Sequence, residues 1–392
     1  MDIRTATPDD LDALGALTGQ AYNKSPAVVV EGLRRVDLGE LHLAVDGHEI
    51  VAVVRAAPVG QFFGGAAVGT ADIRNVVVAA HARSRGLLKA LLHDVLEVSR
   101  SAGVPLSTLT PSAVTAYRRA GYENAGTLVG YRVPVDQVPA RRDDGVEPWG
   151  DDDLDEVMAC YRRFASAHNG PLDRTPAWWH QHVLDPPGGA TQYRYLVRRG
   201  GQVTGYVIYS QTPADGDIPY YYRLDCRDLV WTDEESLRSL LGFVAGNRAL
   251  ATELRWMGPA QEPIALLFDE HVVTRTMSRP WMLRLLDPAA ALEARGYPMG
   301  VAGQVRLTVT DPYLEPGARS LAIEFEDGKA HVSPAEAASA RTHVGTLASL
   351  FSGWLAPSQA VALGRLTGAS DQDMAVLTAA FAGPEPWAMD LV

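Results

Sequence analysis

The sequence predicts an α/β (α+β) fold divided into three consecutive domains, and the order of its strands and helices supports that prediction. In the first segment, short strands alternate with helices, which is typical of a mixed α/β layer. A second segment repeats that order, which indicates a diverged internal duplication. A third segment places strands before helices. We therefore predict domains at residues 1–140, 141–287 and 288–392, which suits roughly 100–200 residues per domain.

The first segment begins with a strand at 3–6 that runs into an acidic helix start. Thr7 can cap that helix, Pro8 suits its first turn, and the two aspartates that follow favour its positive end. The later elements predicted here are a hairpin of strands 41–45 and 50–55, a glycine-rich interruption at 62–68, a strand at 73–78, a helix at 87–99, a strand at 104–110 and a helix at 112–120.

The second segment follows a polar, proline-containing linker at 134–148 and again passes from a strand into an acidic helix start. Its predicted elements are a helix at 154–168, strands at 193–198, 202–209 and 225–231, and a helix at 234–245. The third segment has predicted strands at 305–309, 320–326 and 329–332, and helices at 334–340, 344–351, 357–363 and 371–381. The chain ends in an apolar tail, and because free termini are normally polar, we expect this tail to be docked.

Composition limits the classes of function. Lys and Arg number 35 and Asp and Glu number 47, for a net charge of −12. This charge argues against nucleic acid or an anionic membrane as a partner, and it is compatible with a cationic substrate. Two cysteines, Cys160 and Cys226, exclude a disulfide-rich scaffold and a Cys-ligated zinc site, so we predict no metal. With an acidic N-terminus and no long apolar run, we expect a cytoplasmic protein.

The stretch 75–88 contains the residues that most clearly indicate a ligand-binding site. A β-branched strand ends, a short turn follows, and Arg83-Ser84-Arg85-Gly86 opens a helix. A helix start exposes unpaired N–H groups and a partial positive charge, and a glycine lets backbone approach a ligand closely. Together with the arginines, these features suit a pyrophosphate. The alternative is an ordinary strand–turn–helix with solvated arginines, because short glycine motifs recur by chance.

This stretch resembles motif A of the GNAT superfamily of N-acetyltransferases, in which a V-x-V strand precedes [QR]-x-x-G-x-[GA] and the motif binds the pyrophosphate of acetyl-CoA. Leu88 stands where the superfamily has a small residue. The Arg-Gly-Leu-Leu run is instead similar to the Eis-like (enhanced intracellular survival) acetyltransferases, as are residues 60–65 and the Y-x-x-x-G-Y run from Tyr117 to Tyr122. The resemblance spans the whole chain and implies tandem GNAT-like acetyltransferase domains followed by a sterol-carrier-protein-like α+β domain.

The resemblance also implies roles for individual residues. The residues expected beside the pantetheine arm, polarising the thioester carbonyl through their backbone, are Val76, Val77 and Val78. Those expected around the pyrophosphate are Arg83, Ser84, Arg85, Gly86, Leu87, Leu88 and Lys89. Ser112 and Ala113 would border the cofactor near its sulfur, and Tyr117 matches the general acid. The C-terminal carboxylate, on Val392 here, matches the general base, although the family more often ends in an aromatic residue.

These groups suit acetyl transfer to an amine. A neutral amine attacks the thioester, and main-chain N–H groups stabilise the charge that develops on its oxygen. A phenol of pKa about 10 can donate a proton to the leaving thiolate, of pKa about 8.5, as that thiolate forms in a dry site. An α-carboxyl of pKa about 3.5 is a poor base in water, but burial beside Trp387, Met389 and Leu391 would raise its pKa. No covalent enzyme intermediate is needed, which agrees with the lack of a cysteine in the first domain.

The second domain is expected to bind no CoA and to shape the substrate cleft. The acids 233–235 stand at its corresponding helix start and would repel a pyrophosphate. We expect Cys160 and Cys226 to be packed, unpaired thiols, and Trp178 and Trp179 to serve packing. The tyrosines 220–222 are expected in a strand core, with a wall of the substrate cleft as the alternative.

The resemblance implies an acetyl-CoA-dependent N-acetyltransferase acting on primary amines. The acceptor would be a cationic small molecule or a lysine side chain, such as an aminoglycoside-like compound, a polyamine or a peptide. The resemblance also implies a homo-oligomer, with a hexamer as the expected form. Two alternatives stay open: a catalytically degenerate binding protein whose C-terminal domain carries an apolar ligand, and a transferase for another acyl group. For the C-terminal domain itself we favour a scaffold role.

Overall fold

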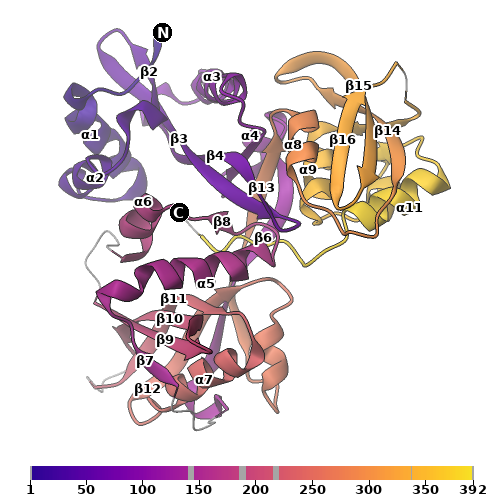
Figure 1. The fold of residues 1–392 in the computed structure, drawn as a ribbon. Helices are drawn as coiled ribbons and strands as arrows, with labels where there is room; N and C mark the ends of the chain where they lie inside the picture. Colours follow the sequence, from indigo (N-terminus) through magenta and orange to yellow (C-terminus); the bar gives the residue numbers. More distant parts are fainter. Residues whose placement is uncertain (1, 140–144, 185–190, 215–219, 337, 391–392) are drawn as a thin grey trace. The chain divides into compact units, whose positions relative to one another are not determined.

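The computed structural model describes residues 2–139, 145–184, 191–214, 220–336 and 338–390 (Figure 1). These residues form two compact units. One comprises residues 2–126 together with Trp281–Gly383, and the other comprises Thr127–Pro280 together with the tail residues 384–390. The predicted third domain therefore shares a unit with the first segment, whereas the tail belongs to the unit of the second. The predicted boundary between residues 140 and 141 lies outside the described residues.

The N-terminal segment of the first unit alternates strands with helices, as predicted. Its strands are β1 (Asp2–Thr5), β2 (Leu41–Asp46), β3 (Glu49–Phe63), β4 (Ala66–Val78) and β5 (Leu106–Leu109). Its helices are α1 (Leu11–Tyr22), α2 (Pro26–Leu33), α3 (Leu87–Ser101) and α4 (Val114–Arg119). The strands pair in chain order, antiparallel except for the parallel pair β4–β5, and residues 282–285 of β13 (Thr274–Leu285) add to β5.

Helices pack on both faces of this sheet (Figure 1). On one face, Leu14 of α1 and Leu33 of α2 pack with Val53 and Val77 of the sheet. On the other face, the residues that α3 contributes to the core are Leu87, Leu91, Leu92, Val95 and Leu96. Their spacing follows the helical period, so one side of α3 is apolar and the other meets solvent. The first turn of α3 is thereby held at the end of β4.

The predicted glycine-rich interruption at 62–68 is wrong. β3 continues to Phe63 and β4 begins at Ala66, so only Gly64 and Gly65 form the turn. Both glycines have positive φ, 58° and 86°, which is the backbone of a two-residue hairpin turn whose twist matches that of the strands. A Cβ at Gly64 would lie 2.0 Å from the Gly296 carbonyl oxygen, so the glycine also permits close backbone packing there.

The C-terminal segment of the first unit has its own sheet, in the order β16-β15-β14-β17-β18. Its strands are β14 (Gly303–Asp311), β15 (Glu315–Glu326), β16 (Lys329–Pro334), β17 (Ala340–His343) and β18 (Leu366–Thr367). Its helices are α8 (Pro288–Ala294), α9 (Val344–Ser352), α10 (Pro357–Ala362) and α11 (Asp371–Ala380). All residues of α9 are buried, so this helix forms the centre of the segment.

The helix predicted at 334–340 is wrong. Pro334 still pairs with Leu321 in β16, and Ala340 already pairs with Leu307 in β17. The described residues between them form no helix. The alanines and glutamate of this stretch favour a helix locally, but strand pairing at both of its ends holds the chain extended, and tertiary pairing overrides local propensity.

The second unit repeats the mixed α/β order around the strand order β6-β12-β11-β10-β9-β7. The strands are β6 (Glu123–Pro134), which begins in the first unit, and β7 (Val146–Pro148), β8 (Leu172–Asp173), β9 (Gln192–Arg199), β10 (Gln202–Pro213), β11 (Tyr222–Trp231) and β12 (Ala251–Gly258). The helices are α5 (Leu154–Ser166), α6 (Pro176–Trp178), a π-helical turn at Trp179–Leu184 and α7 (Glu234–Ala245).

Aromatic residues of the second unit divide between core and surface. Trp178 and Trp179 are buried, so the prediction that they serve packing is confirmed. The prediction of a strand core for the tyrosines 220–222 is wrong for two of the three. Tyr220 is 75% exposed and Tyr221 is 39% exposed, because β11 begins only at Tyr222.

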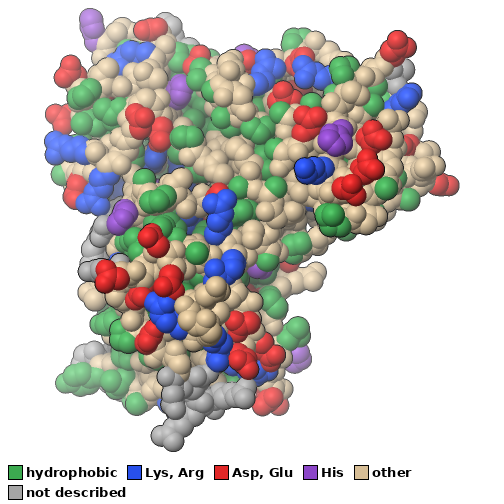
Figure 2. Space-filling model, in the orientation of Figure 1, with side chains coloured by type: hydrophobic (Ala, Val, Ile, Leu, Met, Phe, Trp, Pro, Cys, Tyr) green, Lys and Arg blue, Asp and Glu red, His purple; other side chains and the backbone are tan. Residues whose placement is uncertain are grey.

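The surface carries charges of both signs. On the face drawn in Figure 2, acidic and basic side chains are interspersed, so the net negative charge does not gather there in one patch. No helix among the described residues has both the length and the apolar character needed to cross a membrane.

Candidate functional site

A cavity of about 790 Å³ in the first unit collects most of the predicted binding residues. It lies at the end of β4, over the start of α3 and beside α4. The residues that line it are Val78, Ala82, Arg83, Ser84, Gly86, Leu87, Leu88, Lys89, Leu92, Ala116, Arg119, Ala120, Pro312 and Tyr313. Seven of these were predicted from the sequence, so the strand–turn–helix stretch does enclose a space able to hold a ligand.

The turn before α3 has a backbone conformation that suits the binding of an anion. Ser84 has a φ of 65° and Gly86 a φ of 79°, so two residues of this short turn adopt the left-handed conformation. Such turns direct successive N–H groups into one concavity. Gly86 is also the N-cap of α3, and the first N–H groups of a helix have no partner within it. Backbone donors and the helix dipole therefore favour a negatively charged ligand at this point.

A β-bulge in β4 opens the strand beside the cavity. The register of β3 with β4 shifts around Asn75, which has a φ of 48°. The parallel pairing of β4 with β5 covers Thr70–Asp72 and ends before the bulge. The Ala79 N–H donates to the Val51 carbonyl at 2.9 Å, so the preceding N–H, that of Val78, points to the opposite edge. Because Val78 lines the cavity, this N–H can meet a carbonyl oxygen there.

Three cations give the cavity an excess of positive charge. Arg83, Lys89 and Arg119 line it, and among the described residues none of them has a carboxylate within ion-pair distance. The described residues that line the cavity include no Asp or Glu. Arg85, in contrast, pairs with Asp46 at 2.7 Å and does not line the cavity, although it was predicted to. The chain as a whole has a net charge of −12, so the positive charge of this cavity is opposite in sign to that of the protein and favours an anionic ligand.

Tyr117 lies on α4 but does not line this cavity, whereas its neighbours Ala116, Arg119 and Ala120 do. It is only 3% exposed. Burial, with a smaller contribution from Tyr22, raises the pKa of Tyr117 to about 12. The phenol is therefore protonated, and able to donate, throughout the physiological pH range.

The other predicted residues are distributed around the site. Val76 packs against the core on the α3 side of the sheet, Val77 is buried on the α1 side, and neither lines the cavity. Ser112 and Ala113 are exposed in the turn before α4 and do not line the cavity. Val392 lies outside the described residues.

The tail is docked, as expected, up to the last described residue. Within the second unit, the Trp387 N–H donates to the Asn169 carbonyl at 3.0 Å, and the Ala388 N–H donates to the Thr127 carbonyl at 3.2 Å. Trp387 is 2% exposed, and Ala388 and Met389 are also buried. Apolar burial and two backbone hydrogen bonds therefore hold this segment.

A buried charge network adds to this anchor. Arg174 pairs with Asp390 of the tail at 2.8 Å and with Asp228 of β11 at 2.5 Å. The three side chains are no more than 1% exposed. The guanidinium lies 4.0 Å over the Tyr161 ring, and the Tyr206 hydroxyl donates to Asp228 at 2.9 Å. Burial alone would raise the pKa of Asp228, but the Arg174 charge holds it below its ordinary value.

The second unit has a different structure where the first has its anion site. β11 passes into α7 through Thr232 and Asp233 alone. Asp233 is the N-cap of α7, and its carboxylate accepts the Ser236 N–H at 2.8 Å. The Asp233 carboxylate thus occupies a backbone N–H that an anion would need, and it adds negative charge at the start of α7. Both effects disfavour binding of an anionic ligand there.

Neither cysteine is poised as a nucleophile. Both thiols are free, as predicted. Burial raises the pKa of Cys160 to about 12 and that of Cys226 further, so neither forms a thiolate near neutral pH. Within the described ranges, no three His, Cys, Asp or Glu side chains are grouped so that they could hold a metal ion.

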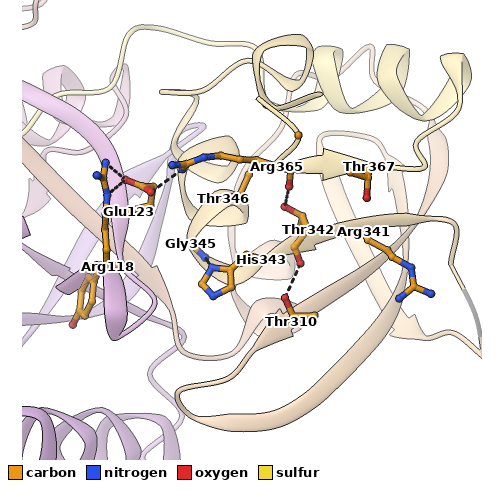
Figure 3. Close-up of a pocket in the computed structure, with 12 residues that line it drawn as sticks. Arg118, Glu123, Thr310, Arg341, Thr342, His343, Gly345, Thr346, Arg365 and Thr367 are labelled. Carbon is orange, nitrogen blue, oxygen red and sulfur yellow. Dashed lines mark hydrogen bonds and ion pairs between the residues drawn. The ribbon is translucent and has the colours of Figure 1, made fainter. Parts of the chain in front are cut away.

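A second cavity of the first unit, of about 490 Å³, lies between the end of α4 and the C-terminal segment (Figure 3). Arg118 and Arg365 both pair with Glu123, at 2.7 and 2.8 Å. The rest of the lining is also largely polar, with His343 and the threonines 310, 342, 346 and 367. None of the predicted site residues that the structure describes lines this cavity. Its polar lining does not suit an apolar ligand.

Sequence reasoning missed seven of the residues that line the larger cavity, among them Arg119, Pro312 and Tyr313. Arg119 follows Tyr117 in the Y-x-x-x-G-Y run, so a helical projection of that run could have drawn attention to it. Pro312 and Tyr313 belong to the C-terminal segment, and no local signal connects them with the turn at Gly86.

Comparisons with known proteins agree with this architecture. Residues 2–125 match an acetyltransferase (GNAT) domain, residues 170–285 match a second acetyltransferase (GNAT) domain, and residues 288–389 match a sterol carrier protein domain. The predicted fold class, two GNAT domains followed by a sterol-carrier-like domain, is confirmed.

Several relatives have similar sequences or structures. An uncharacterized N-acetyltransferase of Streptomyces coelicolor is 32% identical over 60% of this chain and 59% of its own length. The N-acetyltransferase Eis of Mycobacterium tuberculosis is 28% identical over 81% of this chain and 79% of its own. A GCN5-related N-acetyltransferase from Anabaena variabilis has a crystal structure that covers 100% of both chains with a TM-score of 0.93 at 27% identity. The match to the Streptomyces coelicolor relative thus spans less than two thirds of that protein.

Proposed function

Because the chain belongs to the Eis-like family of the GNAT superfamily, we propose that it transfers an acetyl group from acetyl-CoA to a primary amine. The observation that supports this most is the cavity at Gly86. There, left-handed backbone and a helix N-terminus coincide with three cations that pair with no carboxylate in the described part of the chain. This donor set fits a pyrophosphate and a further phosphate. Apolar residues of the same cavity, Val78, Leu88 and Leu92, suit a pantetheine arm.

Acetyl-CoA supplies the activated acetyl group, and the chain supplies positioning and proton transfer. The Val78 N–H stabilises charge on the thioester oxygen. The Tyr117 hydroxyl, protonated at neutral pH, donates toward the departing sulfur. A pKa of about 12 makes this phenol a weak acid, so its main contribution is a hydrogen bond that strengthens as charge develops on sulfur.

The C-terminal carboxylate on Val392 is the proposed base. It accepts the proton that the attacking amine releases, directly or through one water. The support for this role is the resemblance to the family, together with the docked tail, whose last described residue, Asp390, is held by a buried arginine.

The remaining parts of the chain have supporting roles in this proposal. The second domain binds no CoA and shapes the substrate cleft, for which the Asp233 cap at α7 is the support. The acceptor is a cationic amine, either a small molecule such as an aminoglycoside-like compound or polyamine, or a lysine side chain. The protein acts in the cytoplasm as a homo-oligomer, with a hexamer as its expected form.

The decisive experiment combines CoA titration with turnover of acetyl-CoA over a broad panel of amines. CoA should bind to the wild-type chain, and free CoA should appear in the presence of at least one class of polyamine or aminoglycoside-like amine. Absence of CoA binding would refute the proposed function as a whole.

Replacement of Gly86 by Ala should weaken CoA binding and lower the free energy of unfolding by roughly 1–2 kcal/mol. A Cβ at this position would meet no atom within 4 Å, so the cost arises from the φ of 79° and not from a clash. Gly86→Asn is the matched control, because Asn tolerates the left-handed region better. Urea unfolding and CoA titration measure both variants, and equal losses in the two would contradict this explanation.

Extension of the chain by one glycine after Val392 should lower kcat strongly, because it displaces the proposed base by one residue. The Kd for CoA should stay at the wild-type value, since the anion site lies elsewhere in the chain. Val392→Phe, which keeps a terminal carboxylate at the same position, serves as the control and should retain activity. An extended chain with wild-type kcat would exclude the carboxylate as the base.

A further inference from the structure

We propose that the C-terminal domain completes the cofactor site, with Tyr313 as the residue that binds the nucleotide end of CoA. This inference rests on the proposed function, and it gives the domain a role beyond that of a scaffold. Tyr313 lies in the loop 311–314 between β14 and β15, and with Pro312 it lines the same cavity as Gly86 and Lys89. The cofactor cavity is therefore built from two segments that are far apart in the sequence.

The loop is fixed by buried contacts. Leu314 is 7% exposed and belongs to the same apolar core as α3. The Asp311 carboxylate accepts the N–H groups of Tyr313 and Leu314 at 3.2 and 3.3 Å. The same carboxylate pairs at 2.5 Å with Arg284, whose side chain is fully buried and also donates to the Ala120 carbonyl. Because Ala120 ends α4 and lines the cavity, one arginine joins the loop to the cavity wall.

Tyr313 is bonded directly to the helix that carries the anion site. Its hydroxyl donates to the Lys89 carbonyl at 2.7 Å, and its ring lies 5.4 Å from the His93 ring. The Arg284 guanidinium lies over the Tyr313 ring at 5.6 Å. Since the arginine covers one face of the ring and Tyr313 lines the cavity, we infer that a ligand meets the opposite face. A ring held in this way loses little conformational freedom when a ligand packs on it.

The order of groups along the cavity identifies the part of CoA that meets Tyr313. Val78 marks the β4 side, where the pantetheine arm belongs, and the N–H groups after Gly86 mark the pyrophosphate. Tyr313 contacts α3 beyond that point, at Lys89 and His93. The group that continues past the pyrophosphate is the adenosine with its 3′-phosphate. An aromatic face suits the adenine ring, and the Lys89 ammonium suits the phosphate.

Isothermal titration of the full chain with CoA and with its two ends tests this assignment without knowledge of the acceptor. Adenosine 3′,5′-bisphosphate represents the nucleotide end and pantetheine 4′-phosphate represents the other end. Tyr313→Ala should raise the Kd of CoA and of adenosine 3′,5′-bisphosphate about tenfold, as expected for loss of one aromatic–base contact. The Kd of pantetheine 4′-phosphate should not change.

Two variants that each remove a single hydroxyl group test whether the effect of Tyr313→Ala arises from misfolding. Tyr313→Phe keeps the ring and removes the hydrogen bond to Lys89, so it should raise the Kd of CoA by a smaller factor than Tyr313→Ala. Tyr297→Phe is its matched control, because the Tyr297 hydroxyl also donates to a backbone carbonyl, that of Leu292 at 2.7 Å, but does not line the cavity. This control should leave the Kd of CoA unchanged.

The outcomes separate this inference from the function on which it rests. Wild-type binding of CoA combined with an unchanged Kd in Tyr313→Ala would overturn the role of Tyr313 alone. Equal weakening of both fragments would also overturn it, because the nucleotide end would not be the part affected. A wild-type chain that binds no CoA would overturn both the proposed function and this inference.

Discussion

Replacement of Tyr117 by Phe should lower kcat by about a hundredfold or more while leaving the Kd of CoA at the wild-type value. The magnitude is that of losing one positioned proton donor, roughly 10²- to 10⁴-fold. The Kd should not change, because Tyr117 does not line the cavity at Gly86, whereas its neighbours Ala116, Arg119 and Ala120 do. Steady-state rates with an accepted amine, together with CoA titration, measure the two quantities.

The pH dependence of kcat is a second test of the role of Tyr117. A general acid acts in its protonated form, so a raised pKa extends its useful range upward. With a pKa of about 12, Tyr117 should cause no alkaline fall in kcat between about pH 7 and about pH 10. An alkaline fall in that range that is absent from Tyr117→Phe would contradict the raised pKa.

Tyr122 provides the matched control for Tyr117. It is the other tyrosine of the Y-x-x-x-G-Y run, and its hydroxyl lies 2.6 Å from that of Ser107 in a buried position. Tyr122→Phe should cost about 1 kcal/mol of folding free energy, the typical value of one hydrogen bond, with kcat near that of the wild type. Equal loss of kcat in both variants would mean that Tyr117 acts through packing and not as a proton donor.

Replacement of Arg174 by Ala should lower the free energy of unfolding by about 3–5 kcal/mol. The change leaves two carboxylates, Asp228 and Asp390, buried without their main counter-charge. It also removes the guanidinium that lies over Tyr161. Urea unfolding followed by tryptophan fluorescence measures the loss, since Trp178 and Trp179 lie 4.9 and 5.0 Å from the same guanidinium.

Arg238→Ala is the control in the same unit. Arg238 forms an exposed pair with Glu234 on α7 at 2.8 Å, a class of contact worth about 0.3–0.5 kcal/mol. Similar losses in the two variants would contradict the view that the buried network anchors the tail.

Acidification should decrease the stability that the Arg174 network contributes to the folded state. The pKa of Asp228 is lowered in the folded state, so the stability linked to its ionisation is fully present above the unfolded value of 3.8. It decreases as pH falls from there through the folded-state pKa. Arg174→Ala removes the charge that lowers this pKa, so the variant should depend less steeply on pH in the acid range.

Signals in the local sequence were sufficient to predict the elements that surround the site. The strand ending at Val78, the helix beginning at Leu87 and the helix carrying Tyr117 follow from β-branched runs, apolar spacing and glycine placement. These signals depend on neighbouring residues, which is why the predicted elements agree with the structure at these places. The same reasoning failed at 334–340, where strand pairing with distant residues outweighed a local helix preference.

Long-range packing determines which charged and aromatic side chains contact one another. Arg85, a predicted site residue, pairs with Asp46, whereas Arg119, which was not predicted, lines the cavity. Tyr313 bonds to Lys89 across 224 positions, and Arg174 bonds to Asp390 across 216. The physical reason is that a side chain's local propensity carries no information about a partner so far along the chain. Such pairs form only after burial of the separate cores brings their elements together.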